Sequence, residues 1–146
     1  MFILLFMKKL ILAFGFLFLT IILMGQTANV TVTIIDIEEP SGNMSIAIFD
    51  NSDEFPKSIN SYSKTRVHVN SEICQYTFQD IPYGQYAVAV YHDLDKNGEL
   101  DRNWLGIPKE PYGFSNNASS KIGPPDYEDA IVEIDGDINI EIRLKN

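Results

Sequence analysis

The chain lacks the features on which several kinds of protein depend. It has a single cysteine, Cys74, so no disulfide can form within one molecule. It has only two histidines, His68 and His92, and a zinc or catalytic role would require other groups to converge on one of them. It also lacks any long amphipathic helical pattern. Stability must therefore come from packing or from a bound ion.

Positive charge is scarce as well. Acidic residues outnumber lysine and arginine by 20 to 11, and the net charge is −9 at pH 7. Without residues 1–25 the net charge becomes −11, because that segment holds two lysines and no acid. Such a surface repels phosphates, which argues against nucleic acid as a partner.

Residues 1–25 have the layout of a secretory signal. Two lysines follow Met7, and an apolar run at residues 10–24 precedes a glycine. Because this run is shorter than the roughly 20 apolar residues that span a bilayer, we expect cleavage near Gln26 and export to the periplasm, the cell surface or the medium. If translation begins at Met1 and not at Met7, the run lengthens and an uncleaved membrane anchor is the alternative.

A period of two dominates the rest of the chain. Apolar residues alternate with polar ones in seven short runs, at residues 30–35, 44–49, 66–69, 74–78, 86–91, 130–134 and 138–144. Clusters of Gly, Pro, Asn, Asp and Ser separate many of these runs. The pattern predicts an all-β fold, an antiparallel seven-stranded β-sandwich that occupies residues 26–146 as one domain.

Cys74 falls within the fourth of these runs. It shares its phase with Tyr76 and Phe78, on the apolar face of the predicted strand. We therefore expect a buried, unreactive thiol, since a reactive cysteine requires exposure.

Three segments resemble a known family. They are YHDLDKNGELD at residues 91–101, GIPKEPYGFSN at 106–116 and GPPDYEDA at 123–130, and they resemble the bacterial family called domain of unknown function 2141. The resemblance covers essentially the whole chain after the signal. It implies a small exported protein whose β-sandwich is immunoglobulin-like or transthyretin-like, and it implies no established activity.

Within the first segment, oxygen-bearing residues have the spacing of a calcium loop. An EF-hand loop places oxygen ligands at positions 1, 3, 5, 7 and 9, with glycine at position 6. Counted from position 1, this chain offers Asp93, Asp95, Asn97, Gly98, the carbonyl of Glu99, and Asp101. We therefore predict a calcium site, with the alternative that these residues only form a polar turn.

The predicted calcium loop is incomplete. Position 12 should be a bidentate glutamate, and here it is Trp104, while the flanking segments are strands and not helices. A further carboxylate must therefore come from elsewhere in the chain or be replaced by water. The candidates are Glu110, Asp126, Glu128 and Asp129.

Residues 103–129 are rich in Gly, Pro, Asn and Ser, and we interpret them as a long loop. Three aromatic residues in this segment, Trp104, Tyr112 and Phe114, offer a stacking surface for a sugar or a peptide. Alternatively, they cover the open end of the core.

Two classes of function are consistent with these patterns. The first is a non-enzymatic binding or structural module, stabilised by calcium, that presents the segment 106–116 to a protein or glycan of the cell envelope. The second is a hydrolase of small or sugar-like substrates that uses His92 with Asp93, Asp101 or Glu110 as acid and base. The second requires the histidine and two of these carboxylates to converge in one cleft.

Overall fold

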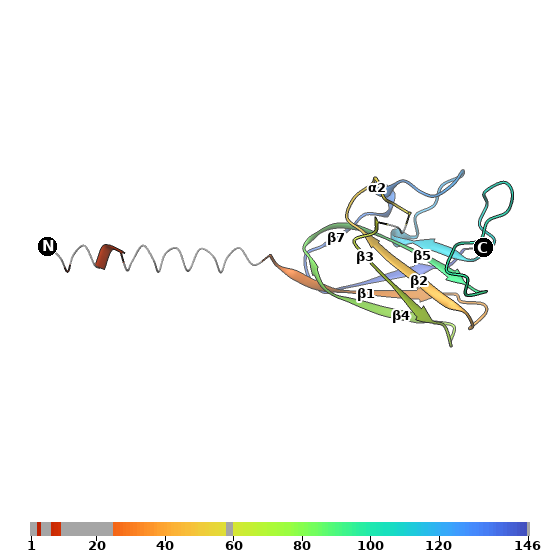
Figure 1. Cartoon of the computed structure of the whole chain (residues 1–146), viewed down its shortest axis with the longest axis horizontal. Helices are drawn as coiled ribbons and strands as arrows, with labels where there is room; N and C mark the ends of the chain where they lie inside the picture. Colours follow the sequence, from red (N-terminus) through yellow and green to blue (C-terminus); the bar gives the residue numbers. More distant parts are fainter. Residues whose placement is uncertain (1–2, 4–6, 10–24, 58–59, 146) are drawn as a thin grey trace.

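The computed structural model describes residues 3, 7–9, 25–57 and 60–145. The strands, which lie between Thr27 and Arg143, form two β-sheets that face each other (Figure 1). One sheet has the strand order β4-β1-β8, and the other has the order β3-β2-β5-β6 with β7 also paired to β5. The elements are β1 (Thr27–Ile35), β2 (Asn43–Phe49), β3 (Ser63–His68), β4 (Cys74–Pro82), β5 (Gly84–Asp93), β6 (Tyr112–Phe114), η2 (Ser115–Asn117), α2 (Tyr127–Ala130), β7 (Val132–Ile134) and β8 (Ile138–Arg143). The predicted all-β class is confirmed.

The core lies between the two sheets because the strands alternate. In β1 the side chains of Val30, Val32 and Ile34 are fully buried, and the threonines between them face outward. On that outer face the hydroxyl oxygens of Thr31 and Thr77 are 2.9 Å apart, which pairs polar groups across the two strands. The period-two pattern therefore reports the inner and outer faces directly.

The strand count and the strand directions differ from the prediction. The described residues form eight strands and not seven, and β1 pairs with β8 in parallel, whereas the sequence predicted a wholly antiparallel arrangement. The additional strand, β6, lies in the segment that we interpreted as a loop. It packs tightly against β8 because its middle residue is glycine: a Cβ atom at Gly113 would lie 2.6 Å from Cγ2 of Ile142.

The predicted signal segment cannot be compared with the structure. Its apolar run, residues 10–24, lies outside the described residues, so cleavage near Gln26 stays a prediction. Among the helices that the structure describes, none is both long enough and apolar enough to cross a membrane.

Strand β5 is central to the second sheet and positions the candidate site. Its inner face carries Tyr86, Val88 and Val90, which belong to the main core. Its outer face begins with Ala87, which packs in a second apolar cluster, and ends with Asp93. We call this second cluster the aromatic cluster, and it consists of Ala47, Phe49, Phe55, Ala87, Phe114 and Ala130.

Candidate metal centre

At the end of β5 the chain folds back and closes a loop. The backbone N–H of Gly98 donates to Oδ2 of Asp93 at 3.0 Å, and the Tyr91 hydroxyl donates to the Gly98 carbonyl at 2.9 Å. Gly98 has a φ of 89°, which a residue with a side chain rarely adopts. The glycine at position 6 thus permits the turn that brings the later residues of the loop back toward Asp93.

Asn97 organises the middle of this loop. Its backbone N–H donates to Oδ1 of Asp95 at 3.1 Å, and its side-chain oxygen accepts the N–H of Glu99 at 2.8 Å. Its amide nitrogen donates to Oδ2 of Asp95 and to Oδ1 of Asp101, both at 3.0 Å. The amide protons therefore offset part of the negative charge of two carboxylates.

Glu110 joins the two ends of the loop. One of its carboxylate oxygens accepts the N–H of Leu94 at 2.9 Å, and the other accepts the N–H of Asp101 at 3.1 Å. Its side chain is only 6% exposed. Of the four acids that the sequence offered as a further ligand, the structure thus brings Glu110 to the loop.

The other three acids lie elsewhere. Glu128 and Asp129 belong to α2, and Asp126 directly precedes it. The hydroxyl of Tyr127 in α2 donates to the carbonyl of Gln85 at 3.2 Å, which places this helix at the opposite end of β5. These acids are therefore not available to the loop.

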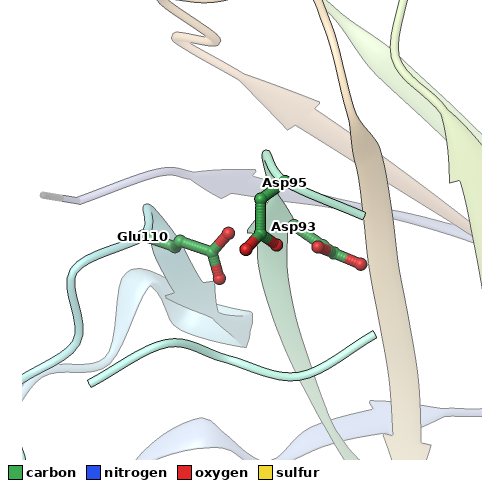
Figure 2. Close-up of side chains that lie close together, drawn as sticks. All are labelled: Asp93, Asp95 and Glu110. Carbon is green, nitrogen blue, oxygen red and sulfur yellow. The ribbon is translucent and has the colours of Figure 1, made fainter. Parts of the chain in front are cut away.

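Three carboxylates gather at the base of the loop. Asp93, Asp95 and Glu110 each offer one oxygen, and these oxygens all lie within 4.8 Å of one another (Figure 2). Among the residues that the structure describes, no lysine or arginine forms a salt bridge with any of the three. Hard oxygen ligands held this closely suit a divalent cation such as Ca²⁺.

Asp93 is the most buried of the three carboxylates. Its side chain is 0% exposed, and its Oδ1 atom has no hydrogen-bond partner among the described residues. A buried carboxylate oxygen without a partner is costly, because it has lost water and gained no donor in return. Turn formation does not require such an atom, whereas metal coordination uses it.

His92 does not join these carboxylates. It lies on the inner face of β5, where its Nε2 atom is 2.6 Å from the carbonyl oxygen of Ser41. His68 is placed similarly, with Nδ1 2.9 Å from the carbonyl oxygen of Gly42. Among the described residues, the acidic cluster includes no histidine. Both histidines hold the turn before β2 in place.

The three aromatic residues of the long segment have different environments. Trp104 is 91% exposed and makes no ring contact with any other described aromatic side chain. Tyr112 and Phe114 are adjacent in β6, with ring centroids 5.9 Å apart. Phe114 is buried and also packs on Phe55, at 5.6 Å. Phe114 therefore packs in the aromatic cluster on the outer face of the second sheet, and both interpretations of the three aromatic residues stay predictions.

The sequence of the chain matches a known family. The model of the family described as "Uncharacterized protein conserved in bacteria (DUF2141)" matches residues 32–142. The chain belongs to this family. The resemblance stated from the sequence is thus confirmed, and the matched range runs from β1 to β8 and includes Glu110 with the whole acidic loop. No curated protein matches the chain, and no solved structure matches it.

Proposed function

We propose that this DUF2141 protein is an exported, non-enzymatic binding or structural module whose loop at residues 93–101 binds calcium. Its sandwich is of the immunoglobulin-like or transthyretin-like kind that the family resemblance implies. The observation that carries the calcium site is the buried, unpartnered Oδ1 atom of Asp93 beside the carboxylates of Asp95 and Glu110. Export is supported by the lysine pair and apolar run of residues 1–25.

The proposed ligands are hard oxygens only, as calcium prefers. They come from the side chains of Asp93, Asp95, Asn97, Asp101 and Glu110 and from the carbonyl of Glu99, with water completing the shell. Glu110 takes the role of the glutamate that is absent at position 12. Calcium binding requires the Asn97 side chain to turn its oxygen inward, and its amide protons then leave Asp95 and Asp101.

The cation would organise more than the loop itself. Glu110 lies in the middle of the long segment, and it is bonded to the backbone at both Leu94 and Asp101. Neutralising the carboxylates would remove their repulsion and hold the segment 106–116 against the end of the sheet. The module would then present this segment to a protein or a glycan of the cell envelope.

No observation favours the alternative of a hydrolase. That function requires His92 to act with two carboxylates, and the His92 ring nitrogen is instead engaged by the carbonyl of Ser41 on the inner face of the sheet. We therefore propose only the function of a calcium-binding module.

Metal analysis and calorimetric titration of the purified protein test the proposal. We expect one calcium per chain, and we expect Asp93→Asn and Glu110→Gln each to weaken calcium binding by at least about tenfold, or ~1.4 kcal/mol. Glu99→Gln is the matched control, because it changes the charge equally while only the carbonyl of Glu99 is a proposed ligand. Titration without heat, or equal losses in all three variants, would contradict the proposal.

A further inference from the structure

The outer face of the second sheet carries a groove of about 930 Å³ beside the acidic loop. Its floor includes Ala47 of β2, Ala89 of β5 and the two aromatic residues of β6, Tyr112 and Phe114. Its walls come from two segments of the chain, residues 98–108 and 120–124. The volume falls within the roughly 300–1,000 Å³ that is typical of small-molecule sites.

One wall of the groove includes part of the acidic loop. Gly98, Glu99 and Leu100 line the groove, and all three belong to the segment 93–101. The backbone of the acidic loop therefore forms a boundary of the groove. Order in the loop sets the shape of this wall.

Large apolar side chains stand exposed on both walls. Leu105 is 60% exposed and Ile107 is 55% exposed on the first wall, and Ile122 is 91% exposed on the second. Exposed apolar groups gathered around a concavity mark a binding surface more often than scattered ones do.

The charge of the groove is opposite to that of the chain. Three cationic residues line it, Lys64, Arg102 and Lys121, against one acid, Glu99. In the whole chain acids outnumber lysine and arginine by 20 to 11. A local excess of positive charge on an acidic protein favours an anionic ligand.

The floor combines the apolar side chains of Ala47, Ala89 and Phe114 with the polar side chains of Ser45 and Tyr91. Its backbone groups lie within the sheet, where Ala47 of β2 is paired with Ala89 of β5 and Ala89 with Phe114 of β6. The Tyr91 hydroxyl, which also lines the groove, already donates to the carbonyl of Gly98. The exposed leucine and isoleucine side chains of the walls favour an apolar body, and the cationic residues favour a negative charge. A ligand with a long apolar body and one charged end suits both features.

We propose that this groove binds an anionic amphiphile, a single alkyl chain that ends in a carboxylate. The chain lies over Ala47 and Ala89 between the two apolar walls, and the carboxylate meets Arg102 and Lys121. This inference goes beyond the proposed function, whose partner is a protein or a glycan, and it rests on that function only for the wall formed by the calcium loop.

Titration of the purified protein with dodecanoate and with dodecanol, below their aggregation limits, tests this inference. We expect dodecanoate to bind about tenfold more tightly than dodecanol. Lys121→Glu should weaken dodecanoate binding by about tenfold and leave dodecanol binding unchanged. Arg102→Glu should act in the same way, and two variants are used because Arg102 also donates to the carbonyl of Gly106.

Ala89→Phe tests the position of the alkyl chain, because it fills the floor and should abolish binding of both ligands. Arg143→Glu, in the other sheet, and Ile73→Asp are matched controls outside the groove lining and should bind dodecanoate normally. An unchanged melting temperature identifies the variants that remain folded. Equal binding of both ligands, indifference to Ala89→Phe, or binding of phospholipid vesicles, acidic peptides or oligosaccharides in place of dodecanoate would overturn the inference.

Calcium binding is measured separately, without the amphiphile. If the protein binds calcium and does not bind dodecanoate, only the inference about the groove is wrong. If the protein binds dodecanoate in the presence of a chelator and never binds calcium, only the proposed calcium site is wrong.

Discussion

The two ends of β5 are stabilised in opposite ways. Near its start, the outer face is covered by the aromatic cluster, where Phe55 packs edge-on against Phe49, Phe114 and Tyr127 with ring centroids 5.3–5.7 Å apart. At its end, the same strand carries Asp93 into a group of carboxylates whose oxygens lie within 4.8 Å of one another. The start of β5 is thus stabilised by packing between side chains of the chain itself, whereas its end brings negatively charged side chains together.

This difference shows at which end of β5 a bound ion can change the stability. Edge-to-face aromatic packing gains energy from burial and ring geometry, neither of which depends on salt or metal. Close carboxylates repel each other, and burial increases the cost. The two ends should therefore respond differently to calcium and to substitution.

The largest loss of stability is expected at the start of β5, where the aromatic cluster lies. Phe49→Ala should lower the free energy of unfolding by about 3–5 kcal/mol, because Phe49 is fully buried and its removal leaves a cavity. Urea denaturation should give the same loss in calcium and in chelator. A loss that changes with calcium would show that the two ends are not independent.

Asp93→Asn tests the acidic end of β5, because its effect on the free energy of unfolding should be stabilising in chelator and destabilising in calcium. In chelator it should raise the free energy of unfolding by about 1 kcal/mol, since it removes a buried charge that has an unpartnered oxygen. In calcium at a hundred times the wild-type dissociation constant, calcium adds about 2.7 kcal/mol; a tenfold weaker site loses about 1.3 kcal/mol of this gain, and a site that no longer binds calcium loses all of it. Denaturation in both buffers measures this, with Glu99→Gln as the control. Destabilisation of equal size in both would contradict the account.

Cys74 provides a third test position, in β4 of the other sheet, which does not contain β5. Cys74→Ala should cost about 1–2 kcal/mol through lost packing, with or without calcium. Burial raises the pKa of the Cys74 thiol, so little thiolate forms near neutral pH. We therefore expect slow labelling by a thiol reagent in the native protein, and rapid labelling would refute the burial.

Trp104 should show the smallest effect. Because its side chain is 91% exposed, Trp104→Ala should change the free energy of unfolding by no more than about 0.5 kcal/mol. Thermal denaturation in calcium measures the change. A larger loss would mean that the long segment packs on the sandwich through Trp104.

The sequence predicted the strands where alternation is long and failed where it is short. The alternation in β1 and β8 is unbroken over several residues, and both strands form as expected. Strand β6 has only three residues, with a glycine in the middle, so it carries no detectable period. Its strand character comes from pairing with β5, which is tertiary information.

The candidate site likewise has one part that the sequence predicted and another that only the fold reveals. The spacing of Asp93, Asp95 and Asn97 was visible because these residues are close in sequence. Glu110 was one of four candidates, and only the fold separates it from the acids near α2. The unpartnered oxygen of Asp93 could not be predicted, since it depends on how the later loop covers the end of β5.

Thermal denaturation of the purified protein in millimolar calcium and in chelator tests the central claim most directly. The account predicts that calcium at about a hundred times its dissociation constant raises the free energy of unfolding by roughly 2.7 kcal/mol, with a clear increase in melting temperature. Identical melting temperatures in the two buffers would contradict it, and residues 93–101 would then be only a polar turn.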